Sequence, residues 1–352
     1  MSRRGWEVLG LVSLAVIVVT IPLSMIRTPA ITTTLQAAPT FTGIASCIEC
    51  HQQQFQDWRG SDHDLAMDVA ADSTVLGDFD DTEFTAHGIT SKFYRRDGGW
   101  FIFTEGPGGT MAEFEVTHVF GHDPLQQYLT PFPGGRLQAL HLAWDQVENR
   151  WLHLYPDIDI PPDDWLHWTR NGQNWNGMCA ECHSTNLKKG YDPATDTYDT
   201  TWDDIDVGCE ACHGPGSDHV AWAGLPPMAR PELANTGFPV PTAQLEGPGV
   251  VENCAPCHSR RAELGDYDHT GGALLDHMLP SLLRDGLYEP DGQIRDEVYV
   301  YGSFLQSKMH ANDVRCSDCH DSHSLKLVKE GNDLCLQCHD ATVYDTYDPV
   351  SY

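Results

Sequence analysis

One five-residue pattern, two cysteines separated by two residues and followed directly by a histidine, occurs six times in this 352-residue chain. In chain order, motifs 1 to 6 hold the pairs Cys47 and Cys50, Cys179 and Cys182, Cys209 and Cys212, Cys254 and Cys257, Cys316 and Cys319, and Cys335 and Cys338. The histidines after them are His51, His183, His213, His258, His320 and His339. Two such thiols can bond to the vinyl groups of one haem while the histidine reaches its iron. The pattern predicts six covalently bound haem c groups with these proximal ligands.

Paired cysteines also occur in structural zinc sites, thioredoxin-like redox pairs and iron–sulfur proteins. Zinc ribbons need no histidine after the second cysteine, ferredoxin cysteines cluster more closely, and a redox motif occurs once. Here a histidine follows every pair, and the six motifs use all twelve cysteines, so none is left for a disulfide. This regularity favours haem over the other three kinds of site.

Twelve further histidines supply candidates for the second axial position. A histidine shortly after a motif lies on the proximal side of that haem, so His219 and His323 are candidates to ligate a neighbouring haem. The predicted distal set is His63, His167, His219, His277, His310 and His323. Weaker candidates are His87, His118, His122, His141, His153, His269, Met67, Met178 and Met309. The methionines are more often core side chains than ligands.

The number of axial ligands decides which functions are open to the protein. A haem with two histidine ligands has no free coordination position, so it passes electrons without binding a substrate. A haem with one open position could instead bind nitrite, hydroxylamine, nitric oxide or a sulfur oxyanion. The supply of histidines favours electron transfer over catalysis.

Charge limits the class of partner. The chain has 51 acidic and 21 basic residues, a formal net charge of −30, which argues against nucleic acid as a partner. An acidic surface keeps a haem-rich protein soluble and steers basic redox partners. A salt-adapted source would give the same composition.

The amino end has the pattern of an export signal. Arg3 and Arg4 precede the uncharged run 8–26, which is long for a cleaved signal and close to the length of a membrane-spanning helix. Residues 35–37 offer a cleavage site, but the run ends at Arg27, well before it, which favours an uncleaved anchor in the inner membrane. Either alternative exports the chain to the periplasmic or extracellular side.

The spacing of the motifs predicts a mainly α fold with much irregular structure around stacked haems. Motifs 2 to 6 lie within residues 179–339, which leaves too little chain per haem for an ordinary apolar core. A β-rich meander is predicted between motifs 1 and 2, with strands at 91–96, 100–104, 111–120, 137–144 and 150–155. A helix is predicted at 61–67, capped by Ser61. The expected segments are 1–39 (signal or anchor with tether), 40–83 (first haem segment), 84–160 (β-rich insertion) and 161–352 (five-haem domain).

Several stretches beyond the bare motifs resemble the cytochrome c554-like multihaem family. They are 45–67, 177–186, 207–217 and 301–339, the last with a doubled CxxCH module, together with 124–128 and 135–140. The resemblance covers most of residues 45–340 and implies an exported electron carrier with closely stacked haem pairs. Longer relatives carry a further haem motif and tetratricopeptide repeats, so functions that need those additions are not implied. No CxxCK motif of the pentahaem nitrite reductases occurs, and six haems are too few for an octahaem hydroxylamine oxidoreductase.

These observations predict an exported hexahaem c-type cytochrome that relays single electrons. Its expected partners are redox proteins, including other cytochromes and a membrane quinol-linked donor, with the membrane itself contacted by the N-terminal helix. Two alternatives stay open: a multihaem reductase or oxidase with one five-coordinate haem, and a subunit of a cytochrome filament or complex.

Overall fold

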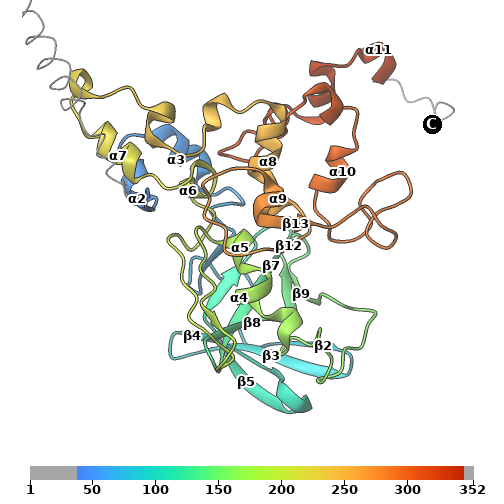
Figure 1. Cartoon of the computed structure of the whole chain (residues 1–352). Coiled ribbons are helices and arrows are strands. Elements are labelled where there is room, and N and C mark those ends of the chain that lie inside the picture. The colour runs from blue at the N-terminus through green and yellow to red at the C-terminus, as the bar shows by residue number, and fades with distance from the viewer. Residues whose placement is uncertain (1–37, 345–352) are drawn as a thin grey trace, which may run out of the picture. The chain divides into compact units, whose positions relative to one another are not determined.

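The computed structural model describes residues 38–344 (Figure 1). The run at 8–26, predicted to be a signal or anchor, lies outside this range. Within residues 38–344, no helix combines the length and the apolar character that a bilayer-spanning helix needs. From Thr40 onward the chain forms one compact unit, and the division of this unit at residues 83 and 160 remains a proposal.

Strands β1 to β9 form two antiparallel sheets in the first half of the described chain. The four-stranded sheet has the order β2-β3-β4-β5, and the five-stranded sheet has the order β1-β6-β7-β8-β9. Their bounds are β1 Met67–Val69, β2 Thr82–Ala86, β3 Ile89–Arg96, β4 Gly99–Glu105, β5 Met111–Val116, β6 His118–Phe120, β7 Leu125–Phe132, β8 Arg136–Asp145 and β9 Arg150–His153. Asp97 and Gly98, both at positive φ, make the tight turn between β3 and β4.

The chain passes from one sheet to the other at Thr117. The sequence predicts one strand over 111–120, but β5 ends at Val116 and β6 begins at His118. The reason is a change of partner, because the Thr117 N–H donates to the Leu129 carbonyl and its own carbonyl accepts from Ala70. Strands β1, β2 and β7 were not predicted from the sequence.

Aromatic side chains fill the space between the two sheets. Phe93 of β3 is fully buried and stacks on Trp151 of β9, with ring centroids 3.6 Å apart. Phe79 and Tyr128 meet the Trp151 ring from other sides. The alternating burial of β3 and β4 turns one face of the sheet into this core. The two sheets and this core are called the β module below.

A second cluster connects the five-stranded sheet to motif 2. Trp175, which is fully buried, packs with Met67 of β1 and Leu129 of β7, and Ala180 of motif 2 belongs to the same cluster. The position of the motif 2 helices is therefore set by the sheet.

The prediction of a mainly α fold is wrong. The structure is 27% helix and 24% strand and contains four sheets. The helices within residues 38–344 are short, because only α8 among them reaches 12 residues, whereas β8 alone has 10. The helices are α2 Ala45–Ile48, α3 Gln52–Trp58, α4 Trp175–Met178, α5 Ala180–His183, α6 Cys209–His213, α7 Ser217–Ala223, α8 Gly247–His258, α9 Leu274–His277, α10 Tyr301–Leu305 and α11 Ala341–Tyr344. Two-stranded ribbons pair β10 Tyr191–Asp192 with β11 Thr197–Tyr198, and β12 Arg261–Glu263 with β13 Met278–Pro280.

The predicted helix at 61–67 is also wrong. Residues 61–66 form turns, although the Ser61 hydroxyl does accept a hydrogen bond from the Asp64 N–H, as a helix cap would. The chain then enters β1, where Met67 pairs with Phe120 of β6. The tertiary pairing overrides the local capping signal.

Apolar clusters are small beyond residue 250. One consists of Ala255, Tyr267, Leu274 and Met278, and another of Leu287, Tyr288 and Val298. Large apolar side chains in this part, such as Leu264 and Leu282, are exposed. Such clusters cannot supply the core of an ordinary domain of this length, which agrees with a fold built around cofactors.

The two phenylalanines on neighbouring strands of the same sheet give a matched test of the β module. Phe93→Ala should lower the free energy of unfolding by about 3–5 kcal/mol, because it removes a fully buried ring from the aromatic core. Phe103→Ala, at a ring that is 41% exposed, should change it by less than about 1 kcal/mol. Denaturant unfolding followed by far-ultraviolet circular dichroism measures both. Equal losses would contradict this account of the core.

Candidate haem sites

The cysteines and the histidine of one motif are brought to the same side by a single helical turn. In motifs 1, 5 and 6 the histidine N–H donates to the carbonyl of the first cysteine, at 3.0, 2.9 and 3.0 Å. Side chains three and four residues apart on such a turn share one face. All twelve thiols are free of disulfides. This is the arrangement that attachment and ligation by one haem require.

Three proximal histidines have a second histidine ring beside them. The ring centroids of His51 and His219 are 6.0 Å apart, and those of His258 and His63 are 6.3 Å apart. The rings of His213 and His323 are 6.5 Å apart and nearly parallel, with an interplanar angle of 14°. Each pair joins a motif to a histidine that is distant in sequence.

These separations fit one metal ion between two imidazoles. Two metal–nitrogen bonds of about 2 Å, with the distance from nitrogen to ring centre added on each side, place the centroids roughly 6 Å apart. The chain's own residues therefore fit haem in motifs 1, 3 and 4, with His219, His323 and His63 as the second ligands. The assignment of these ligands stays a prediction.

Hydrogen bonds from Nδ1 orient the rings of several proximal and predicted distal histidines. His183 donates from Nδ1 to the Ala66 carbonyl at 2.8 Å, His219 to the Thr236 carbonyl at 3.0 Å, and His320 to the Leu325 carbonyl at 3.3 Å. A proton fixed on Nδ1 leaves the lone pair on Nε2, the atom that would face a metal. His213 Nδ1 lies 3.0 Å from the Thr242 hydroxyl.

Burial keeps two of the paired rings neutral. It lowers the pKa of His63 to about 4, with the nearby His258 adding to the effect. It also lowers the pKa of His213 to about 4, and His323 adds to that shift. Neutral imidazole is the form that binds metal.

The other three predicted distal ligands have different neighbours. His167 lies in the β module, with Nε2 3.8 Å from a Glu105 carboxylate oxygen. His277 packs on Tyr267, and His310 packs on Phe304. Among the weaker candidates, His269 is buried and has both ring nitrogens engaged, with the Ala211 carbonyl and the Asn186 N–H. Met67 lies in the core beside motif 2.

The motifs lie next to one another in one connected, branched network. Thiols contact each other between motifs 1 and 3 (Cys47 and Cys209), between motifs 2 and 4 (Cys182 and Cys257), and between motifs 4 and 5 (Cys254 and Cys316). Cys212 of motif 3 is close enough to Cys254 and Cys257 to interact with them electrostatically. Cys319 of motif 5 interacts in the same way with Cys335 and Cys338 of motif 6.

Motif 1 is held against motif 3 by a buried carboxylate inside motif 3. Glu210 is 1% exposed and accepts hydrogen bonds from the backbone N–H groups of Thr42, Gly43 and Gly216 at 2.7–3.0 Å. Asp204 accepts from the next N–H, that of Ile44, at 3.3 Å. The segment that leads into motif 1 is thus fixed by acceptors more than 150 residues away.

A second glutamate, Glu181 of motif 2, also holds two motifs together. A Glu181 carboxylate oxygen lies 3.1 Å from a guanidinium nitrogen of Arg261, and both side chains are 8% exposed. Arg261 follows motif 4 by three residues, so this ion pair joins motifs 2 and 4. Sequence reasoning missed both glutamates. The available signal was an acidic residue between the two cysteines of a motif, but Glu49 of motif 1 has the same signal and is exposed.

Comparison with protein families finds two matches. The family described as "Cytochrome c554 and c-prime" matches residues 46–83 and 168–214, and the doubled CXXCH motif matches residues 309–344. A comparison with curated proteins found no match.

Two solved structures are similar to this chain. One is the outer cell wall cytochrome OcwA, with a TM-score of 0.53 and 15% identity over 86% of this chain and 68% of that one. The likeness to OcwA concerns the fold. The other is an undecahaem cytochrome from the S-layer of Carboxydothermus ferrireducens, with a TM-score of 0.44 and 19% identity over 88% of this chain and 44% of that one.

Glu210 is buried and Glu49 is exposed, so the two glutamates provide a matched test. Glu210→Gln should lower the free energy of unfolding by about 1.5–3 kcal/mol. The reason is that the carboxylate has two acceptor oxygens and a negative charge, whereas the amide has one acceptor oxygen and no charge. Glu49→Gln, at an exposed position in motif 1, should have little effect. Denaturant unfolding of the haem-loaded protein, followed at the haem absorption band, measures both. An unchanged stability for Glu210→Gln would refute the role given to this carboxylate.

Proposed function

Because the chain is a multihaem c-type cytochrome, we propose that it binds six haems and relays single electrons along them. The observation that carries the proposal is the unbroken adjacency of the six motifs together with the three histidine pairs at 6.0–6.5 Å. Bound haem iron would supply the one-electron redox change. The protein's own residues hold neighbouring sites together, and His219, His323 and His63 would fill the second axial positions in motifs 1, 3 and 4.

The order of the motifs in space supports a chain rather than isolated sites. Motif 4 lies at the junction, because its cysteines contact motifs 2 and 5 and interact with motif 3. Motif 1 reaches the junction through motif 3, and motif 6 reaches it through motif 5. An electron that enters at any motif therefore has a route through neighbouring sites to every other motif.

The proposal includes export and redox partners. Residues 8–26 would carry the chain to the periplasmic or extracellular side and anchor it at the inner membrane, and the CxxCH motifs suit an exported protein. The formal charge of −30 favours a basic docking surface on the electron donor or acceptor. Redox proteins, including other cytochromes and a quinol-linked donor, are the proposed partners.

A second candidate function, reduction of a small nitrogen or sulfur oxyanion, would use motif 2. The aromatic neighbour of His183 is Phe120, edge-on at 5.3 Å, and a phenyl ring cannot ligate iron. Tyr299, whose backbone is left-handed at φ 57°, and Glu297 both lie close to Cys179. A phenol and a carboxylate are the groups that a proton-coupled reduction would need if the haem of motif 2 had an open coordination position.

Removal of a proposed distal ligand tests the first function. His63→Ala, His219→Ala and His323→Ala should each convert one haem in six from low spin to high spin, because the iron loses its second strong-field ligand. His167→Ala, at a histidine that the structure places in the β module, should leave the spin state unchanged. Electron paramagnetic resonance of the oxidised protein measures the high-spin fraction.

Spectra of the same haem-loaded protein distinguish the electron relay from the reductase. Native protein that is low spin throughout and binds no carbon monoxide when reduced supports the relay. A high-spin haem in the native protein, with turnover of nitrite, hydroxylamine or sulfite by an artificial donor, supports the reductase. Native-like spectra in all three ligand variants would refute the proposed ligand set.

A further inference from the structure

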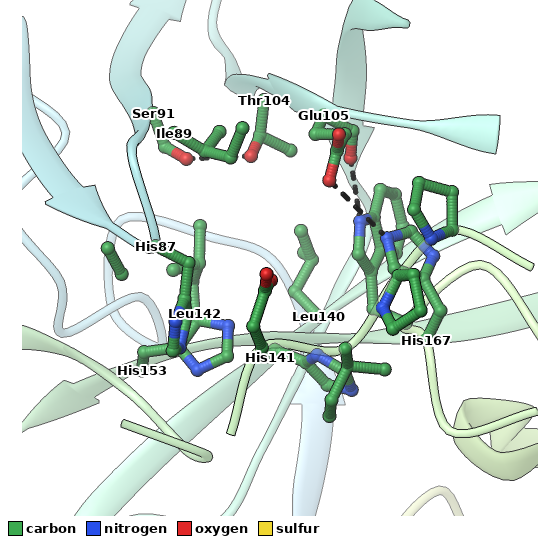
Figure 2. A pocket seen from close by; sticks show the side chains of 16 residues that line it. His87, Ile89, Ser91, Thr104, Glu105, Leu140, His141, Leu142, His153 and His167 are labelled. Carbon is green, nitrogen blue, oxygen red and sulfur yellow. Dashed lines mark hydrogen bonds and ion pairs between the residues drawn. The ribbon is translucent and has the colours of Figure 1, made fainter. Parts of the chain in front are cut away.

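The β module contains a cavity of about 310 Å³ that the proposed haem sites do not use. It lies between the two sheets, and Figure 2 shows Ser91, Thr104 and Glu105 on one side and His141 and His153 on the other. Cavities of this size commonly hold small organic ligands. The polar and apolar groups that line it therefore indicate which kind of ligand fits.

The His141 ring has a buried nitrogen atom with no partner. The residue lines the cavity and is 4% exposed, and its Nε2 makes no hydrogen bond. Burial, with a contribution from His153, lowers the pKa of His141 to about 3, so the ring is neutral at pH 7. The ring's hydrogen bond to the Leu166 backbone raises that pKa, so the ring is the donor in it. The unpaired Nε2 therefore carries a lone pair that can accept a hydrogen bond.

His153 supplies a hydrogen-bond donor beside this acceptor. Burial lowers the pKa of His153, which favours the neutral ring. Its Nδ1 accepts the Tyr155 N–H at 3.1 Å, so the proton of the neutral ring is on Nε2. The rings of His141 and His153 meet edge to face with their centroids 5.4 Å apart. An acceptor and a donor thus lie next to each other on the same side of the cavity (Figure 2).

The polar side chains on the opposite side of the cavity already have partners. The Ser91 and Thr104 hydroxyls are hydrogen-bonded to each other at 2.6 Å. A Glu105 carboxylate oxygen lies 3.8 Å from His167 Nε2. Of the side chains that line the cavity, only His141 has a buried polar atom without a hydrogen bond. The polar group that a ligand must satisfy is therefore the His141 Nε2.

A hydroxyl group matches His141 and His153 together. One hydroxyl oxygen can donate to His141 Nε2 and accept from the His153 Nε2–H. An ammonium group cannot accept a hydrogen bond and a carboxylate cannot donate one, so neither satisfies both rings. A metal ion does not fit, because no three His, Cys, Asp or Glu side chains within residues 38–344 are placed to hold one.

Apolar side chains form much of the remaining wall and suit an aromatic ring. Leu140, Leu142 and Trp168 are each at most 5% exposed, and Pro161 and Pro162 also line the cavity. A sugar or another polyol would bury further hydroxyls against these side chains without partners. Water would fill the cavity only as a cluster, because one water molecule occupies roughly 30 Å³ in the liquid. A flat apolar ring with one hydroxyl fits better than either.

We propose that the cavity between the two sheets binds one phenol, a small planar aromatic molecule with a free hydroxyl. The hydroxyl donates to His141 Nε2 and accepts from the His153 Nε2–H, and the ring lies against Leu140, Leu142 and Trp168. This site is separate from the haem sites and does not depend on the proposed electron relay.

The test compares two isomeric ligands on full-length, haem-loaded protein by isothermal titration calorimetry. The isomers para-ethylphenol and para-methylanisole have the same atoms, but only the phenol can donate a hydrogen bond. Wild type should bind one para-ethylphenol at least tenfold more tightly than para-methylanisole, because the ether leaves the His141 Nε2 unpaired. His141→Phe should bind the two isomers about equally, because its ring has no acceptor nitrogen.

The matched control is His122→Ala, at a half-buried histidine outside the cavity; it should keep the wild-type preference for the phenol. The haem absorption spectrum is recorded along the same titration and should not change. A spectral change that follows the binding heat would place the phenol at haem iron and overturn the proposal.

Circular dichroism shows whether the variants remain folded. If His141→Phe does not fold, anomalous scattering from wild-type crystals grown with para-bromophenol locates the ligand independently. A bromine atom beside Leu140 and Trp168 supports the proposal. A bromine atom elsewhere, no preference for the phenol in wild type, or a preference that persists in folded His141→Phe overturns it.

Discussion

The buried carboxylate of Glu210 is the interaction on which the arrangement of the haem motifs depends most. It satisfies three backbone N–H groups, two of them on the segment before motif 1, from a position inside motif 3. A buried charge is stable only when it is hydrogen-bonded in this way. Because motif 1 is separated from motif 3 by the whole β module, this carboxylate, together with Asp204, brings the first haem motif to the others.

The β module acts as a frame for motif 2 and for the chain that leads to His63. Its sheets have an aromatic core of their own, in contrast to the small apolar clusters beyond residue 250. Trp175 and Met67, in a separate cluster, connect the five-stranded sheet to motif 2, and the Ala66 carbonyl just before β1 accepts from His183. The module thus transmits the rigidity of a sheet to a part of the protein with short helices and little core of its own.

The histidines of this chain have at least three kinds of surroundings, and the hydrogen bonds of each ring distinguish them. His219, with Nδ1 on a carbonyl and a second histidine beside it, has the arrangement proposed for an iron ligand. His269, with both nitrogens engaged, is a structural link. His141 has a buried and unpaired Nε2 and lines the cavity between the two sheets. Sequence distance from a motif does not distinguish these cases.

The sequence by itself determined the chemistry of this protein. Covalent attachment is a local property, because a five-residue motif contains both thiols and the proximal histidine, so the haem prediction needed no fold. The tertiary structure decided which histidine lies opposite which motif, because His63 and His258 are 195 positions apart and only folding brings them within 6.3 Å. It also decided the fold class, since β1 and the switch at Thr117 depend on pairing with distant strands. Likewise, Glu181 and Glu49 occupy the same position in their motifs, and burial alone gives one of them a structural role.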